Sequence, residues 1–315
     1  MKSNKKLSII VPCKNESEVL NEFYSKTIEV LNKITNNYEI IFINDGSTDN
    51  TFEIMMGLYE KDKNIIILNL SRNFGKEIAL TAGLDYSTGD AVIPIDADLQ
   101  DPPELMIALW TKWQEGFDVV YATRMERKGE TLIKKFTAYM FYIVIAKLVN
   151  IKIPKNTGDY RLMDKKVVKA LKSLKERNRF MKGIFSWVGY KQTGVMYNRE
   201  PRFAGKSKFN FLKLTAFAIE GITSFTYKPL RIASILGILT FLFSILYSLF
   251  IVIHKLTTGN DPSGYASTVI FILFFGGIQL LSIGLIGEYV GRIYDEVKQR
   301  PLYIIDSIFK NTNIK

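Results

Sequence analysis

Short apolar runs alternate along the first part of the chain with longer segments whose apolar residues recur at helical spacing. The runs that predict strands are residues 7–11, 39–43, 65–70, 91–95 and 117–122. The segments that predict helices are residues 17–34, 76–86 and 103–114. Because buried strands alternate with helices, the pattern predicts an α/β fold, with a mostly parallel sheet covered by helices on both faces.

Two charge-free apolar segments near the C-terminus, residues 232–253 and 262–287, exceed the roughly 20 residues that are needed to cross a bilayer. The loop between them is short and nearly neutral, and too little chain remains to bury such a hairpin in a soluble core. Basic residues flank the outer ends, namely Lys228, Arg231, Arg292, Lys298 and Arg300. By the positive-inside rule, we expect a multi-pass protein of the cell inner or plasma membrane with both ends in the cytoplasm.

The charge of the chain is unevenly distributed. The net charge is +11 over 315 residues, and residues 151–228 alone carry 18 basic and 5 acidic side chains. Anionic lipid head groups attract such a segment by about 1 kcal/mol per charge, so membrane lipids are an expected partner. Nucleic acid is not expected, because no nucleic-acid-binding motif is visible. Residues 131–148 and 207–227 have the spacing of amphipathic helices, which would lie at the membrane interface or pack on the soluble domain.

Carboxylates follow two of the predicted strands. Residues 96–104 read Asp-Ala-Asp-Leu-Gln-Asp-Pro-Pro-Glu, directly after the strand at 91–95, and Asp45 follows another strand. Parallel sheets bind ligands beyond the carboxyl ends of their strands. Asp98 and Gln100 supply the oxygen ligands that Mg²⁺ or Mn²⁺ prefers, while Asp96 would face a nucleotide sugar. A diphosphate site beside a membrane suggests a water-soluble donor and a lipid acceptor.

Several motifs together resemble a known family. Residues 9–16 (Ile-Ile-Val-Pro-Cys-Lys-Asn-Glu), 44–47 (Asn-Asp-Gly-Ser) and 96–104 resemble the family 2 inverting glycosyltransferases, which have the GT-A fold, a Rossmann-like arrangement. Later motifs are similar to those of the polyprenyl-phosphate glycosyltransferases, which include dolichol-phosphate mannosyltransferases and bactoprenol glucosyltransferases. These are residues 157–162 (Thr-Gly-Asp-Tyr-Arg-Leu), 202–208 (Arg-Phe-Ala-Gly-Lys-Ser-Lys) and 287–294 (Gly-Glu-Tyr-Val-Gly-Arg-Ile-Tyr). Two C-terminal spans favour the bactoprenol type.

The resemblance implies roles for individual residues. Those implied to bind the nucleotide sugar or the phosphates of donor and acceptor are Pro12, Glu16, Asp45, Asp96, Ala97, Arg124, Arg202 and Lys208. Asp98 and Gln100 match the metal ligands, and Asp159, together with Asp98, matches the catalytic carboxylates. Asp159 would act as a base, orient the acceptor or stabilise positive charge on the sugar. The alternative is a loop carboxylate paired with Arg161. Arg72 and Lys76 fit a structural role as well as a phosphate contact.

The resemblance also implies a domain organisation. We expect a GT-A catalytic domain in residues 1–165, a basic juxtamembrane segment of interface helices in 166–228, two transmembrane helices in 229–292 and a cytoplasmic tail in 293–315. A homo-oligomer is a further expectation from resemblance.

The implied activity is inverting transfer of one sugar from a nucleotide-diphosphate sugar, UDP-glucose or a related UDP-sugar, to polyprenyl phosphate on the cytoplasmic face. The alternatives are a GDP-mannose-dependent mannosyltransferase, a polysaccharide synthase and a non-catalytic membrane scaffold. A synthase would normally carry a Gln-X-X-Arg-Trp motif and more spans, and neither is present.

Overall fold

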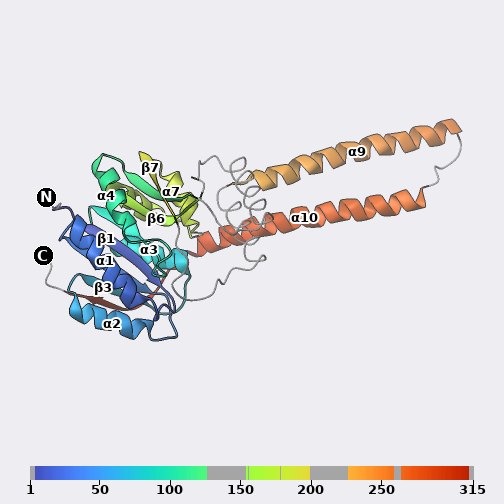
Figure 1. Cartoon of the computed structure of the whole chain (residues 1–315). Coiled ribbons are helices and arrows are strands. Elements are labelled where there is room, and N and C mark those ends of the chain that lie inside the picture. Colours follow the sequence, from blue (N-terminus) through green and yellow to red (C-terminus); the bar gives the residue numbers. More distant parts are fainter. Residues whose placement is uncertain are drawn as a thin grey trace. The chain divides into compact units, whose positions relative to one another are not determined.

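The computed structural model describes residues 4–125, 154, 156–177, 179–198, 226–258 and 264–311 (Figure 1). The chain divides into two compact units. The first comprises Met1–Phe217 and Arg300–Lys315 and contains the sheet with its helices. The second comprises Ala218–Gln299 and contains two long helices.

The first unit is built on an eight-stranded sheet with the order β7-β5-β6-β4-β1-β2-β3-β8. The strands are β1 (Leu7–Cys13), β2 (Tyr38–Asn44), β3 (Ile65–Leu70), β4 (Ala91–Pro94), β5 (Val119–Arg124), β6 (Thr157–Asp164), β7 (Gln192–Tyr197) and β8 (Ile305–Lys310). Strand β1 pairs in parallel with β2 and β4, as do β2 with β3 and β5 with β7. Among the described strands, β6 and β8 run antiparallel to the strands with which they pair. The predicted mostly parallel sheet is therefore confirmed.

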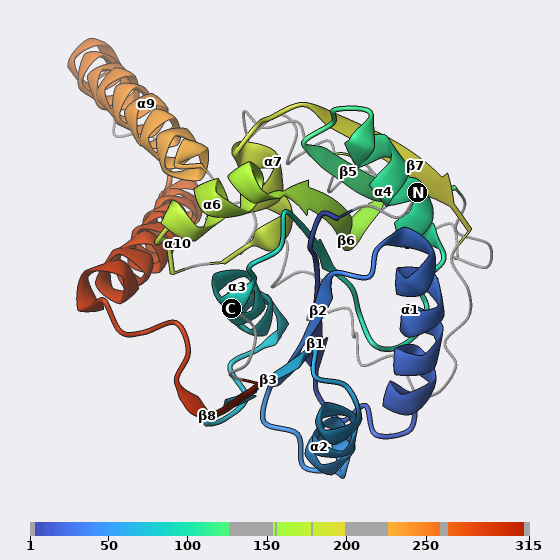
Figure 2. The ribbon, with the colours of Figure 1, turned by 90° about the vertical axis from the view of Figure 1, so that its left-hand side faces the viewer.

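Helices cover both faces of this sheet (Figure 2). They are α1 (Leu20–Ile34), α2 (Thr51–Lys61), α3 (Lys76–Tyr86), α4 (Leu105–Gln114), α6 (Lys165–Ser173) and α7 (Met181–Trp187). Helix α1 contacts α2 and α4 on one face, and α3 contacts α6 on the other. Helix α3 packs closely on β1, because a Cβ at Gly83 would lie 2.3 Å from Cγ2 of Ile10.

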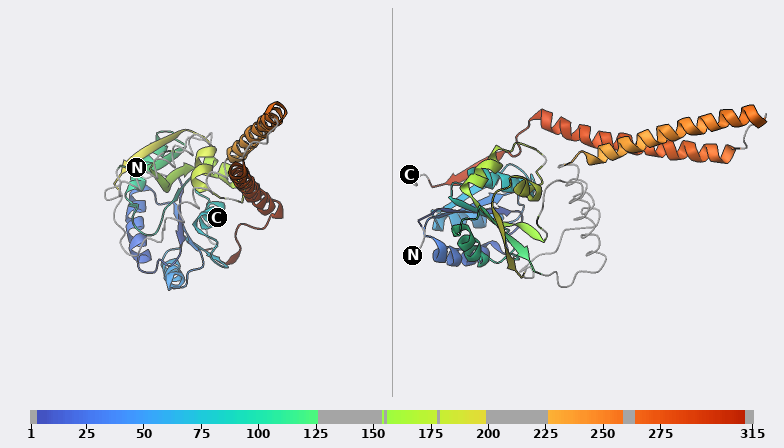
Figure 3. Two further views of the ribbon diagram at one scale, coloured as in Figure 1. Left: turned by 90° about the vertical axis from the view of Figure 1, so that its right-hand side faces the viewer. Right: turned by 90° about the horizontal axis from the view of Figure 1, so that it is seen from above.

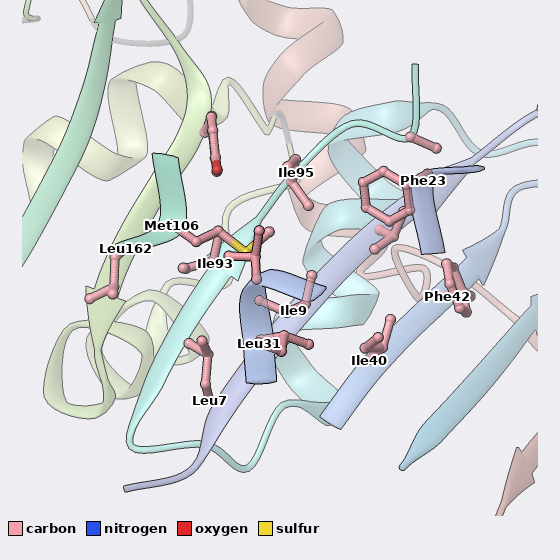
Figure 4. Close-up of a cluster of buried hydrophobic side chains, with 14 of the residues drawn as sticks. Leu7, Ile9, Phe23, Leu31, Ile40, Phe42, Ile93, Ile95, Met106 and Leu162 are labelled. Atoms are coloured by element: carbon pink, nitrogen blue, oxygen red, sulfur yellow. The ribbon is translucent and has the colours of Figure 1, made fainter. Parts of the chain in front are cut away.

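Alternate residues of β1 form the core beneath α1 and α4 (Figure 4). Leu7 and Ile9 are fully buried there, together with Phe23 and Leu31 of α1. These side chains explain why α1 forms where it does, since its apolar positions recur at helical spacing and face the sheet. Packing of this core therefore holds β1, β2 and β4 in place, so that their carboxyl ends lie at the same edge of the sheet.

The structure corrects two expected domain boundaries. The unit that contains the sheet continues beyond residue 165, because α6, α7 and β7 follow in the same unit and β7 pairs with β5. Residues 293–315 are not simply a tail, since the last helix runs to Lys298 and β8 then pairs with the edge strand β3. Phe309 of β8 contacts the rings of Phe52 and Tyr59 in α2, which explains why the strand returns to the sheet.

The second unit is a helical hairpin of α9 (Lys228–Thr258) and α10 (Tyr265–Lys298), shown from two further directions in Figure 3. The two helices touch through aromatic rings, since Phe243 and Tyr247 both contact Phe271. Both are long and apolar enough to cross a membrane, over Leu230–Thr257 and Ser267–Lys298. The expected interface helices at 131–148 and 207–227 lie outside the described residues, except for the last two of the second range.

The packing of β8 makes a prediction about stability. Phe309→Ala should lower the free energy of unfolding of the first unit by about 2–3 kcal/mol, because a partly buried ring between Phe52 and Tyr59 is lost. The control is Ile308→Ala on the opposite face of the strand, where the side chain is 45% exposed. Thermal unfolding of both variants in detergent checks the prediction, and equal losses in the two would contradict it.

Candidate active site

A pocket of about 910 Å³ lies in the first unit where the parallel strands end. Its lining includes the following residues singled out from the sequence: Pro12, Glu16, Asp45, Asp96, Ala97, Asp98, Gln100, Arg124 and Asp159. Residues that the sequence interpretation did not assign to the site also line it, among them Glu77, Asp101 and Lys182, together with Lys76, whose role was left open. Arg202 and Lys208 lie outside the described residues. The fold thus brings most of the candidate residues to one place.

The loops after β1 and β2 are joined by side-chain hydrogen bonds. The backbone N–H of Thr48 donates to Oδ1 of Asn15 (2.8 Å), and the N–H of Asn15 donates to Oγ of Ser47 (3.1 Å). Asn15 has a φ of 57°, a left-handed conformation that asparagine tolerates better than most residues. The N–H of Glu16 donates to Oγ1 of Thr51 (2.8 Å). These bonds fix Glu16 at the rim of the pocket.

Asp45 organises a third loop. Its carboxylate is 3% exposed and accepts hydrogen bonds from the N–H groups of Phe74 (2.7 Å) and Gly75 (3.0 Å). The loop can approach only because residue 46 is glycine, at a φ of +63°, where a Cβ would lie 2.5 Å from the nitrogen of Asn73. In this structure Asp45 therefore positions the segment that leads into α3, and its contact with a nucleotide stays a prediction.

The acidic loop after β4 turns sharply between its two metal-ligand candidates. Leu99 has a φ of 57° and is 6% exposed, and the N–H of Gln100 donates to Oδ1 of Asp98 (3.2 Å). The side chains of Asp98 and Gln100 offer the carboxylate and amide oxygens that Mg²⁺ and Mn²⁺ accept, which fits such an ion. Within the described part of the chain, no group of three or more His, Cys, Asp or Glu could hold a metal.

Lys76 joins two carboxylates across the pocket. Its Nζ lies 2.6 Å from Oδ1 of Asp96 and 3.0 Å from Oδ2 of Asp159. Burial opposes its charge, but Asp96 and Asp159 outweigh burial and raise the pKa of Lys76 well above its ordinary value. Burial also opposes the charge of Asp159 and by itself would raise the pKa of that carboxyl group. The nearby charges of Lys76 and Lys182 outweigh burial and lower the pKa of Asp159 to about 2. Asp159 is therefore ionised at neutral pH.

The alternative pairing of Asp159 with Arg161 is not the arrangement found. Nη2 of Arg161 donates to the carbonyl oxygen of Gly158 (2.8 Å), and its guanidinium lies over the ring of Phe185. Arg161 is 3% exposed, and burial lowers the pKa of its guanidinium to about 10. Among the described ion pairs, the partner of Asp159 is Lys76.

Arg124 is held by a tyrosine that no sequence motif marked. Nε of Arg124 donates to the hydroxyl of Tyr197 (3.2 Å), and that hydroxyl donates to Oδ1 of Asp101. Nη2 of Arg124 is also 3.8 Å from the same carboxylate oxygen. Burial and the charge of Asp101 raise the pKa of Tyr197 to about 12, so the hydroxyl keeps its proton. Tyr197 thus ties β7 to β5 and to the acidic loop.

The sheet is mostly parallel, and its carboxyl edge carries an acidic loop together with several basic side chains. These features define an α/β protein equipped to bind a phosphate-bearing ligand. The chain belongs to glycosyl transferase family 2, whose profile matches residues 8–172, and it is a glycosyltransferase. Residues 228–293 match a second profile, the GtrB C-terminal hairpin.

Relatives resemble the chain along almost its full length. An uncharacterized glycosyltransferase of Synechocystis sp. is 55% identical, over 96% of this chain and 95% of that protein. The SfII prophage-derived bactoprenol glucosyl transferase of Shigella flexneri is 49% identical, over 95% of this chain and 97% of that protein. The prophage bactoprenol glucosyl transferase homolog of Escherichia coli is 47% identical, over 97% and 100% of the two chains. The resemblance to family 2 and to the bactoprenol type is confirmed.

The contacts of Tyr197 lead to a testable prediction. Tyr197→Phe should lower the free energy of unfolding by about 1–3 kcal/mol, because the buried carboxylate of Asp101 loses a hydrogen-bond donor. Tyr190→Phe serves as the control, since the Tyr190 side chain is 43% exposed. The measurement is chemical unfolding of the detergent-solubilised protein followed by tryptophan fluorescence. A loss no larger than that of the control would count against the contact.

Proposed function

We propose that this glycosyltransferase transfers one glucose from UDP-glucose, or a related sugar from its UDP donor, to polyprenyl phosphate, with inversion at the sugar. The observation that carries the proposal is that carboxylates and cationic side chains from α3, β5, β6, α7 and the loops after β1, β2 and β4 line one pocket, in a chain that also carries a GtrB hairpin. The names of the Shigella and Escherichia relatives support bactoprenol as acceptor and glucose as the sugar.

The residues of the pocket can be given roles in this reaction. Pro12, Glu16 and Asp45 would bind the nucleotide, and Asp96 and Ala97 would contact the donor sugar. Asp98 and Gln100 would hold Mg²⁺ or Mn²⁺, which when bound neutralises charge that develops on the departing diphosphate. Arg124, kept in place by Tyr197, would add a fixed positive charge in the same pocket.

Asp159 would act on the acceptor side of the reaction. A phosphate monoester with a second pKa near ~6 is already mostly dianionic at neutral pH and needs little activation. Because the acceptor needs little activation, Asp159 is better suited to orienting the substrates, or to stabilising positive charge on an oxocarbenium-like sugar, than to removing a proton. Arg202 and Lys208 would hold the acceptor phosphate.

The hairpin would anchor the enzyme in the membrane, with the catalytic unit in the cytoplasm. The supporting observation is the distribution of charge, because basic residues flank the outer ends of α9 and α10. The excess positive charge of residues 151–228 would attract anionic lipid head groups on that side.

The activity is tested by incubating the purified protein in detergent micelles with polyprenyl phosphate, Mg²⁺ and one radiolabelled donor at a time. We expect a labelled lipid from UDP-glucose and much less from GDP-mannose. The product should be labile to mild acid and stable to mild alkali, as a phosphodiester-linked sugar is, and it should be absent when the lipid is omitted. No labelled lipid from any donor would contradict the proposed activity, and labelling from GDP-mannose alone would replace glucose by mannose.

The metal assignment is tested separately. Asp98→Asn should reduce turnover by about a hundredfold or more, because the variant loses a charged ligand of the ion that stabilises the leaving group. EDTA should have the same effect on the wild-type enzyme, and added Mg²⁺ or Mn²⁺ should reverse it. Glu115→Gln, which neutralises an exposed carboxylate paired with Lys112, is the matched control and should stay active. Full activity of Asp98→Asn, or of the wild type in EDTA, would overturn the assignment.

A further inference from the structure

Lys76 connects three elements that are far apart in the sequence. The lysine lies in the first turn of α3, Asp96 follows β4, and Asp159 belongs to β6. Its Nζ is within 3.0 Å of a carboxylate oxygen of each partner. Helix α3 is in turn fixed at this end by the bonds from Phe74 and Gly75 to Asp45. The ammonium group is therefore carried on a firmly held helix start.

The two bridged carboxylates differ in exposure. The side chain of Asp159 is 15% exposed and that of Asp96 is 31% exposed, whereas that of Lys76 is 45% exposed. Oδ2 of Asp159 contacts Lys76, but Oδ1 is buried and has no hydrogen-bond partner among the described residues. A buried carboxylate oxygen without a partner is costly, so this atom is a natural contact for a bound substrate.

Acidic side chains gather around this position. Glu77 follows Lys76 on the same turn and lines the same pocket, and burial together with the charge of Asp159 raises the pKa of Glu77 to about 8. Lys182 of α7 also lines the pocket and attracts both acidic groups. Lys76 is in direct contact with both Asp96 and Asp159, so its removal would take away the bridge between those two carboxylates.

We propose that Lys76 is a positioning residue that holds the sugar-facing carboxylate of Asp96 at a fixed separation from Asp159 and directs Oδ1 of Asp159 toward the substrates. The inference rests on the proposed function, because it assigns the two carboxylates to the donor sugar and to the transfer step. Lys76 acts through these partners. Its positive charge is already balanced by the two carboxylates, without a phosphate.

The first test separates positioning from binding. Lys76→Met should lower kcat for lipid glucosylation by about 10- to 100-fold and change the KM for UDP-glucose by less than about threefold, because orientation is lost rather than a substrate contact. Lys76→Arg should recover part of the rate, since it restores the bridging charge. Lys112→Met removes an exposed lysine paired with Glu115 on α4 and should behave as the wild type. A raised KM with unchanged kcat would make Lys76 a donor-binding residue and overturn the proposal.

The second test is a double-mutant cycle. In an Asp159→Asn background, Lys76→Met should lower kcat by a smaller factor than it does in the wild type, because one of the two carboxylates through which Lys76 acts has already been neutralised. Full additivity of the two losses would contradict the proposal. Thermal unfolding of the same four proteins gives a second readout, in which the two substitutions should also be non-additive. If wild type and Lys112→Met form no labelled lipid, the proposed function fails, and the unfolding cycle alone then decides whether the bridge exists.

Discussion

Charge compensation at the carboxyl edge of the sheet is the constraint on which the rest of the site depends. Four of the carboxylates that gather there, Asp45, Asp96, Asp101 and Asp159, are each balanced by a group from a distant segment of the chain. Asp45 accepts from backbone N–H groups of the loop before α3, and Asp101 accepts from a hydroxyl of β7. Asp96 and Asp159 share Lys76. Because each partner comes from a distant part of the sequence, the interactions of these acidic groups connect separate segments of the chain around the pocket.

The opposite edge of the same sheet shows what a purely structural carboxylate looks like. Glu39 is 2% exposed, and both its oxygens are fully engaged. Oε1 accepts from Ser8 (2.6 Å) and from the N–H of Thr88 (2.7 Å), while Oε2 accepts from the Thr88 hydroxyl (2.8 Å) and pairs with Lys6 (2.6 Å). Asp159 differs, because one of its oxygens has no partner within the described ranges. The contrast separates a carboxylate that holds strands together from one that is available to a ligand.

Local patterns predicted the central elements well. The predicted strand at residues 65–70 coincides with β3, and the predicted helix at residues 76–86 coincides with α3. The motif residues met at one edge because parallel strands end together. Strands β6, β7 and β8 were missed, since their pairing depends on contacts with distant residues that no local period reveals. Lys76 was left open for the same reason: a lysine after glycine has no signature of its own, and its role follows only from where β4 and β6 place their aspartates.

The connectivity of the chain restricts the topology of the hairpin independently of its charges. Strand β7 precedes α9, and β8 follows α10, yet both strands belong to one sheet. A soluble sheet cannot form across a bilayer, so a chain that leaves it and returns must cross an even number of times. Among the described residues two helices, α9 and α10, are of spanning length, and two crossings satisfy that requirement. The final strand, β8, which resembled a tail in the sequence, therefore supports the proposed topology, in which both ends of the hairpin lie on the same side of a membrane.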